Sequence, residues 1–395
     1  MIHQNFPGQF RHLALHYANQ PEHQIIAIGR QGCPGLPGVR TLTYQLHRQP
    51  VKGSHHYLRT FESGVLHGQA VVRLLLQLKQ HGFLPDVIVA HPGRGESLFV
   101  KEVFPESKLI HFCEWYYHPS GVDAGFDPEF PLSLDDQARI RTRNAMHLLN
   151  LEQCDVAVAP THWQKQVHPA SYHNKIQVIH EGIDTALLGP NPQAEFTLPN
   201  GHTIRTGDPV VTYVARNLEP YRGFHVFMRT LPALLAAHPT CQVMIVGGDS
   251  VSYGSKPKHA TGWKEALLQE VSIDPNRVHF LGKIPYDRYR LLLQISAAHV
   301  YLTYPFVLSW SLLEAMATGC LVIGSDTPPV REVIQHGVNG LLVPFFDQAR
   351  LVRTLQHALS HPMDYQALRN AAWQQAQGYA RERGLATYAT LFGAS

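Results

Sequence analysis

The sequence predicts an α/β fold made of two doubly wound domains of similar size that face a cleft. Apolar, strand-like runs alternate with helix-like segments along the whole chain, the pattern of parallel sheets covered by helices. With 395 residues the chain is too long for one ordinary hydrophobic core. A polar segment at residues 191–208, rich in Pro, Gly and Asn, has the composition of a linker. We therefore expect a first domain at residues 1–190 and a second at residues 209–375.

The first domain is expected to combine short strands with an amphipathic helix. Val and Leu recur at helical spacing between residues 64 and 81, which predicts the helix. The strand-like runs are short and apolar, and several are rich in β-branched residues. They lie at residues 24–29, 86–91, 108–112, 155–159 and 176–180.

The second domain repeats this alternation. Its strand-like runs lie at residues 210–215, 242–246, 278–281, 299–303, 320–324 and 341–343. The tail at residues 376–395 is predicted to be a helix that packs back on the first domain. Open parallel sheets bind their ligands beyond the carboxyl ends of the strands, so functional residues are expected in the turns that follow these runs.

Composition excludes several classes of function. The formal net charge of +3 is small for this length and gives no reason to expect a nucleic-acid partner. None of the 26 His falls in a metal-ligand spacing, so no metal site is predicted. The five Cys are odd in number and widely spaced, which fits reduced thiols in the cytoplasm. Neither a signal-peptide pattern nor a bilayer-spanning apolar run is present in the sequence, so we expect a cytoplasmic enzyme.

The most informative segment is residues 309–319, which follows a strand-like run and opens a helix rich in small hydroxyl residues. A helix N-terminus carries unpaired amides and a partial positive charge, so it suits phosphate. Glu314, one turn further in, is placed to accept hydrogen bonds from a ribose diol. The alternative is an exposed helix carboxylate with no ligand. The pattern favours a nucleotide-diphosphate site.

Two arginines and a glycine pair follow other strands of the second domain. Arg216 comes directly after a predicted strand, and Arg222 follows one short loop later. Two cations at such a turn suit a pyrophosphate, because they neutralise its charge as it leaves. The alternative for Arg222 is a solvated residue at a helix start. Gly247 and Gly248 form a turn at which a ligand can approach the backbone.

These segments occur with others in a fixed order. The set comprises residues 216–223, 246–248, 280–282, 312–319 and 337–343. In this order they resemble the retaining glycosyltransferases of family 4, which have the GT-B fold of two Rossmann-like domains. The resemblance implies that Arg216 and Arg222 hold the diphosphate of a sugar nucleotide and that Glu314 binds its ribose. It also implies that phosphate is capped by the amides near Ser309, Trp310, Ser311 and Leu312, and that Lys283 and Ile284 lie beside the base.

The chain departs from the family pattern at one position. The family usually carries a second Glu eight residues before the position of Glu314, where it contacts the donor sugar, and here that position is Phe306. An aromatic ring cannot accept hydrogen bonds from sugar hydroxyls as a carboxylate does. The resemblance therefore leaves three readings open: a less hydroxylated donor sugar, a sugar held from elsewhere, or lost activity.

The first half is similar to the N-terminal domain of a subgroup of these enzymes. The matching segments are residues 5–10, 90–96, 112–117 and 125–128. Gly8 would let the first loop approach the donor phosphate or the acceptor. Glu114 would orient the donor or stabilise positive charge at the anomeric carbon, and His91 would contact donor or acceptor. The alternatives are a structural carboxylate paired with a nearby arginine for Glu114 and a structural, hydrogen-bonded histidine for His91.

The resemblance thus implies a retaining, metal-independent glycosyltransferase that moves a sugar from a nucleotide diphosphate sugar to a glycan or lipid-linked acceptor, in bacterial-type surface polysaccharide synthesis. No cofactor is expected besides this co-substrate, because the arginines and a helix dipole take the place of a cation. A lipid-linked acceptor would bring the protein into peripheral contact with the inner face of the membrane. The alternatives are another GT-B enzyme, such as a phosphorylase or a sugar-nucleotide epimerase, and a non-catalytic nucleotide-sugar-binding protein.

Overall fold

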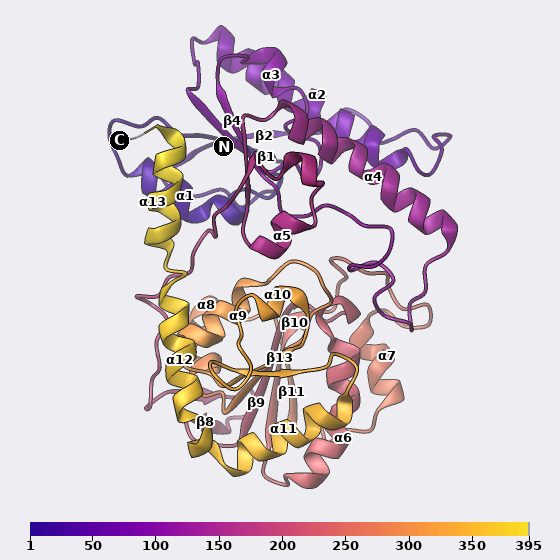
Figure 1. Cartoon of the computed structure of the whole chain (residues 1–395), viewed down its shortest axis with the longest axis vertical. Helices are drawn as coiled ribbons and strands as arrows, with labels where there is room; N and C mark the ends of the chain where they lie inside the picture. The colour runs from indigo at the N-terminus through magenta and orange to yellow at the C-terminus, as the bar shows by residue number, and fades with distance from the viewer. Residues whose placement is uncertain (394–395) are drawn as a thin grey trace. The chain divides into compact units, whose positions relative to one another are not determined.

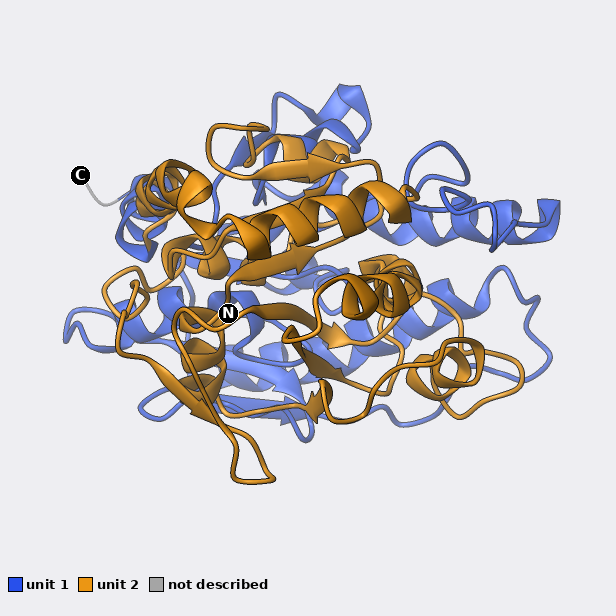
Figure 2. Cartoon of the chain, turned by 90° about the horizontal axis from the view of Figure 1, so that it is seen from below, with its two compact units in different colours: residues 1–182, 381–395 blue, residues 183–380 orange. Residues whose placement is uncertain are grey.

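The computed structural model describes residues 1–393, and the chain divides into two compact units (Figure 2). Unit 1 consists of Met1–Gly182 together with the chain from Arg381 onward, and unit 2 consists of Ile183–Ala380. Unit 1 is therefore discontinuous in sequence, with the whole of unit 2 inserted into it. Each unit contains its own parallel sheet and its own hydrophobic core.

The sheet of unit 1 is assembled around the first residues of the chain. Ile2 lies between two strands, forming parallel bridges to Ile28 of β1 (Ile26–Arg30) and to Ala90 of β3 (Val87–Ala90). On one side β1 pairs with β2 (Arg40–Tyr44). On the other side the order is β3-β4-β5-β6, all parallel, with β4 at Lys108–Phe112, β5 at Val156–Ala159 and β6 at Ile176–Val178.

Helices complete unit 1, and one of them comes from the end of the chain. α13 (Arg381–Phe392) packs against α1 (Arg11–Ala18) and contributes Tyr388 and Leu391 to the core (Figure 1). Ser133 caps α4 (Leu134–Gln153) because its hydroxyl accepts from the Asp136 amide while the Asp136 carboxylate accepts from the Ser133 amide. The remaining helical elements are η1 (Gly8–Phe10), α2 (Arg59–Gln80), α3 (Val100–Val103), α5 (His162–Gln166) and η2 (Ala170–Tyr172).

The sheet of unit 2 has six parallel strands in the order β11-β10-β9-β12-β13-β14. Their bounds are Val210–Asn217 for β9, Gln242–Gly248 for β10, Val278–Gly282 for β11, Ala298–Tyr301 for β12, Val322–Ser325 for β13 and Leu341–Val343 for β14. The chain winds outward in one direction from β9 and in the other from β12, so the winding direction reverses between these two neighbours. The central strands are buried, as their apolar residues predict.

Helical elements of unit 2 connect these strands in sequence, and the last three follow β14 (Figure 1). They are η3 (Pro220–Arg222), α6 (Phe224–Ala237), α7 (Trp263–Glu270), α8 (Tyr286–Gln294), α9 (Trp310–Ala317), α10 (Pro328–Arg331), α11 (Gln348–Ser360), η4 (Pro362–Tyr365) and α12 (Gln366–Gln377). Within the described residues, no helix combines the length and the apolar character that crossing a bilayer requires.

The segment at residues 191–208 differs from the linker that its composition suggested. It forms an antiparallel hairpin of β7 (Glu195–Thr197) and β8 (Thr203–Arg205), and it belongs to unit 2, which already begins at Ile183. Phe196 and Ile204 are buried in a core cluster of unit 2. The two strands have three residues each, too short to show an alternating pattern among the Pro, Gly and Asn residues around them.

Candidate functional site

The winding reversal in unit 2 gathers the residues predicted to bind a nucleotide. Open sheets bind ligands beyond the carboxyl ends of the strands at such a reversal. β9 ends with Arg216 and Asn217, and β12 leads through a short loop into α9. Arg216 is exposed, so its guanidinium is accessible to a ligand.

The glycine pair at the end of β10 allows close backbone approach. A Cβ added to Gly247 would lie 2.8 Å from the Ala215 carbonyl, and one added to Gly248 would lie 2.8 Å from Cε of Lys283. Lys283 is exposed directly after β11, whereas Ile284 packs against apolar clusters of unit 2. Side chains in place of these glycines would crowd the end of β9 and displace Lys283.

The start of α9 is more fully hydrogen-bonded than the sequence suggested. The Ser309 amide donates to the Tyr301 hydroxyl at 2.8 Å, and the Leu312 amide donates to the Ser309 carbonyl at 3.2 Å. Ser309 is also the N-cap, accepting from the Ser311 amide at a long 3.4 Å. These contacts engage three amides of the turn within the chain, and the neighbouring Trp310 is half-buried against the core.

Glu314 is held by two phenols of α8. The Tyr286 hydroxyl donates to Oε1 and the Tyr289 hydroxyl to Oε2, each at 2.8 Å. Burial raises the pKa of Glu314 and outweighs these two hydrogen bonds, which lower it. The alternative of an exposed, solvated helix carboxylate is therefore wrong. Each carboxylate oxygen has a second lone-pair site, so the group retains capacity for a further donor.

Arg222 is buried, so the alternative of a solvated helix-start residue is also wrong. Its Nη1 donates to the Thr303 hydroxyl and to the Val307 carbonyl, both at 2.9 Å. The next residue, Gly223, has φ +67°, and a Cβ there would overlap the Leu302 side chain. The guanidinium of Arg222 thus links η3 to the loop that leads into α9.

Glu219 has a structural role that the sequence reasoning missed. It is 1% exposed, and its carboxylate accepts from the backbone amides of Ser252, Tyr253 and Gly254 at 3.0–3.2 Å. We call residues 252–254 the anchored loop. A signal existed, because an acidic residue lies between Arg216 and Arg222 in a turn directly after a strand.

Phe306 packs against the anchored loop through the ring of Tyr253. Its ring is 4.7 Å from that of Tyr253 and 5.4 Å from that of Tyr221, and the Arg222 guanidinium lies 5.8 Å from its centroid. Phe306 is only 4% exposed. The ring that stands in the place of the family's first Glu is therefore a member of a buried aromatic cluster.

The predicted residues of unit 1 meet at the corresponding edge of its own sheet. His91 follows β3 and Glu114 follows β4, with His91 Nε2 3.4 Å from Glu114 Oε2. Gln9, in η1, donates from Nε2 to Glu114 Oε1 at 3.0 Å. Gly8 precedes it with φ +46°, against the His3 ring. The sheet winds outward in both directions from residues 1–3, so this edge is also a reversal.

The charge of His91 is set by opposing influences. Burial lowers its pKa, but the hydrogen bond and charge of Glu114, with the charges of Glu96 and Glu181, raise it above the ordinary value. The Gly93 amide donates to Nδ1 at 3.1 Å, so in the neutral ring the proton lies on Nε2, facing Glu114. The Glu114 carboxylate therefore has one oxygen near His91 and the other bonded to Gln9.

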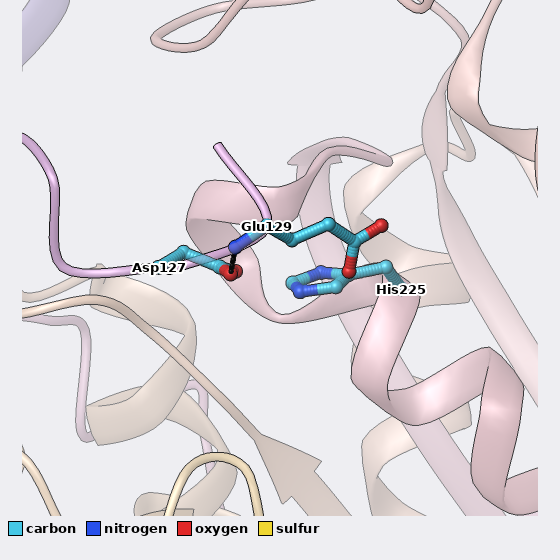
Figure 3. A group of neighbouring side chains, drawn as sticks. All are labelled: Asp127, Glu129 and His225. Carbon is cyan, nitrogen blue, oxygen red and sulfur yellow. Dashed lines mark hydrogen bonds between the residues drawn. The ribbon is translucent and has the colours of Figure 1, made fainter. Parts of the chain in front are cut away.

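The loop before α4 contains an acidic turn. The Glu129 amide donates to Oδ1 of Asp127 at 2.9 Å, which closes the turn (Figure 3). Asp127 is buried and Glu129 is exposed. His225, drawn in the same figure, is a buried residue of α6 in unit 2.

Two of the similar proteins have names that describe glycosyl transfer to inositol compounds. A D-inositol 3-phosphate glycosyltransferase of Acidothermus cellulolyticus is 25% identical over 202 residues, covering 50% of this chain and 43% of the relative. A phosphatidyl-myo-inositol mannosyltransferase of Mycolicibacterium smegmatis is 28% identical over 173 residues, covering 43% of this chain and 39% of the relative. The chain thus spans less than half the length of either relative.

Solved structures share the fold over nearly the whole chain. A sucrose-phosphate synthase from Thermosynechococcus elongatus superposes with a TM-score of 0.70 at 20% identity, covering 98% of this chain and 92% of that one. HepE of Anabaena, solved in complex with UDP-glucose, gives a TM-score of 0.68 at 15% identity, covering 100% and 98%. The predicted class of two Rossmann-like α/β domains with parallel sheets, as in GT-B enzymes, is confirmed.

Two family models divide the chain between them. Residues 21–188 match the model described as the glycosyl transferase family 4 group. Residues 195–375 match the model described as glycosyl transferases group 1. The predicted family is confirmed: this chain belongs to the group 1, family 4 glycosyltransferases.

Proposed function

We propose that this protein transfers a sugar from a nucleotide diphosphate sugar to a glycan or lipid-linked acceptor, with retention of configuration and without a metal ion. The observation that carries the proposal is the chemistry at the two winding reversals. Arg216, the glycine pair and Glu314 lie at or beside the one in unit 2, and His91 and Glu114 lie at the one in unit 1. Family membership supports the same reaction class.

Unit 2 is the proposed nucleotide-binding unit. The exposed Arg216 binds the diphosphate, and the buried Arg222 adds positive charge from behind the loop that precedes α9. Glu314 binds the ribose through the lone pairs that its two tyrosines leave, and Lys283 lies beside the base. Because Ser309 and Leu312 already donate within the chain, the arginines carry more of the phosphate binding than the helix amides do. A UDP-sugar is the proposed donor, supported by the complex of HepE.

Unit 1 supplies the groups for the reacting sugar and the acceptor. As the bond between the anomeric carbon and the phosphate breaks, the nucleoside diphosphate leaves with the bonding electrons. The acceptor oxygen forms the new bond, and its proton passes to the departing phosphate. The Glu114 carboxylate stabilises the positive charge that develops at the anomeric carbon, and the arginines stabilise the negative charge on the leaving group. The names of the relatives favour an acceptor with an inositol phosphate headgroup, and a lipid version of it would bring the protein to the inner membrane face.

The test combines binding and product analysis. Thermal shift against UDP-, GDP- and dTDP-sugars identifies the donor, and NMR of the product anomer reports retention. Arg216→Ala should reduce turnover by at least about 100-fold, as loss of a stabilising charge at a leaving group does. Arg353→Ala, an exposed arginine on α11, is the matched control and should transfer normally. Normal transfer by both variants would refute the assignment of Arg216.

Phe306 favours a second candidate, a nucleotide-sugar-binding protein without turnover. Its ring is buried in the aromatic cluster and offers no acceptor to a sugar hydroxyl. Calorimetry separates the candidates: binding of a nucleotide sugar with no consumption in the presence of inositol phosphate, phosphatidylinositol vesicles or glycan acceptors supports the second. Release of a sugar phosphate on addition of inorganic phosphate would instead indicate a phosphorylase.

A further inference from the structure

One side chain at the reversal in unit 1 has a role that neither the sequence motifs nor the proposed reaction explains. Gln9 lies between two groups in an unbroken line of hydrogen bonds. Its Oε1 is 2.8 Å from His3 Nε2, and its Nε2 is 3.0 Å from Glu114 Oε1. Gln9 and Glu114 are 105 positions apart in the chain, so only the fold brings them together.

The direction of every bond in this line is fixed by two backbone amides. The Asn5 amide donates to His3 Nδ1 at 3.0 Å, so the His3 proton lies on Nε2 and donates to Gln9 Oε1. The Gln9 amide nitrogen must then donate to Glu114. From the other side, the Gly93 amide accounts for His91 Nδ1, so Nε2–H faces the second carboxylate oxygen. Both oxygens of Glu114 are thus held by donors whose own orientation is fixed.

We infer that Gln9, supported by His3, is a positioning residue that fixes the orientation of the Glu114 carboxylate and keeps it ionised for glycosyl transfer. This inference rests on the proposed function for the role of Glu114. The side chain of Glu114 is 32% exposed, so part of the carboxylate faces solvent, and the bond from Gln9 restrains its rotation. An amide suits the position because it donates a hydrogen bond at every pH without carrying charge.

Gly8 allows Gln9 to reach both of its hydrogen-bond partners. Its φ of +46° is a conformation that side chains disfavour, and a Cβ there would overlap the His3 ring. The absence of a side chain lets the loop turn against His3 and place Gln9 within reach of both neighbours. The close packing against His3 therefore explains the glycine at position 8 in a different way from the predicted approach to the donor phosphate.

A second carboxyl group beside Glu114 should change the pH dependence of the reaction. Gln9→Glu is nearly isosteric and places a second carboxyl group about 3 Å from Glu114, where like charges cannot both ionise freely. One carboxyl of the pair then ionises only at higher pH. The substitution leaves the neighbouring titratable and charged groups in place. Besides His3 and His91, these are Glu96 and Glu181, whose charges act on His91, and His147 with Arg143 and His168, whose charges act on His147 together with that of Glu114.

The experiment is the pH profile of kcat/KM for the wild type, Gln9→Glu, Gln9→Leu and the surface control Gln80→Glu. In Gln9→Glu the acidic limb should move up by about one pH unit or more. Gln9→Leu should lower kcat about 10- to 100-fold, with the KM for the donor changed less than threefold, because the nucleotide binds unit 2. Gln80→Glu adds the same charge at an exposed site and should superpose on the wild type. Circular dichroism checks that each variant is folded.

A second readout separates failure of this inference from failure of the proposed function. Long-range ¹H–¹⁵N NMR reports the tautomer of His3 and the titration of His91 without any turnover. Gln9→Glu should raise the pKa of His91 further, and the wild type should show the Nε2–H tautomer of His3. If both NMR results are observed but no nucleotide sugar is consumed, the positioning role of Gln9 is supported and the proposed function is refuted. An acidic limb and a His91 titration that both match the wild type would overturn the inference, whether Gln9→Leu is active or not.

Discussion

Removing the Glu219 carboxylate should release the anchored loop while leaving the sheet of unit 2 intact. Glu219 is buried, and its partners are three consecutive backbone amides of a loop whose Ser252 and Gly254 are exposed. Glu219→Ala removes all the acceptors, whereas Glu219→Gln retains one carbonyl oxygen. The two substitutions should therefore have graded effects on the same local opening.

The size of the effect follows from the number of amides. A hydrogen bond to a charged acceptor contributes about 1.5–3 kcal/mol, which sets an upper bound of about 5–9 kcal/mol for three. Once detached, the amides of this exposed loop regain hydrogen bonds to water, so the net loss approaches about 1 kcal/mol each. We therefore expect opening of the loop to become about 3 kcal/mol easier in Glu219→Ala, and about half as much in Glu219→Gln.

Hydrogen exchange of a peptide that spans the anchored loop measures this opening directly. A loss of about 3 kcal/mol corresponds to roughly 100-fold faster exchange of these amides. Glu195→Ala is the control, since Glu195 pairs with Arg205 on the exposed surface of the hairpin and should leave the loop unchanged. Exchange within about threefold of the wild type in Glu219→Ala would refute the reasoning, because it would mean that the carboxylate does not hold the loop.

Two further predictions concern the aromatic cluster and His91. Phe306→Glu should lower the Tm by several °C more than Phe306→Leu does, because it buries a negative charge among aromatic rings. The Arg222 guanidinium, which lies near the Phe306 ring, offsets only part of this cost. Equal Tm values of the two variants in thermal unfolding would contradict the buried position of the ring. The pKa of His91 is raised in the folded state, so its protonation stabilises the fold below the unfolded pKa of about 6.5, and this contribution is lost as pH rises through the higher folded value. His91→Gln should therefore flatten the dependence of stability on pH in that window, and an unchanged Tm difference from pH 5 to 9 would argue against the raised pKa.

The fold was predictable because its signals are local. The runs that became β3, β4, β9 and β10 are apolar and bounded by turns. Arg216 and Glu314 could be singled out because each follows a strand at a short distance along the chain. The hairpin around Phe196 escaped prediction because its strands are too short for periodicity.

The remaining part of the site depends on long-range packing. Gln9 meets Glu114 across 105 positions, and no local pattern marks a glutamine as the partner of a distant carboxylate. In unit 2, the two tyrosines that donate to Glu314 come from a different helix. Their role therefore follows from the packing of α8 against α9. Sequence patterns identify groups at strand ends, and packing decides which groups restrain them.

The interrupted order of unit 1 has a consequence for how the protein is made. Tyr388 and Leu391 of α13 pack in the same cluster as Phe10 and Leu13, yet they leave the ribosome only after all of Ile183–Ala380. During synthesis, part of the apolar surface of residues 1–182 therefore stays exposed until α13 has been made, although all of unit 2 has been synthesised by then. A separately expressed fragment of residues 1–182 should share that incomplete state, and adding a peptide with the sequence of α13 should restore its thermal stability.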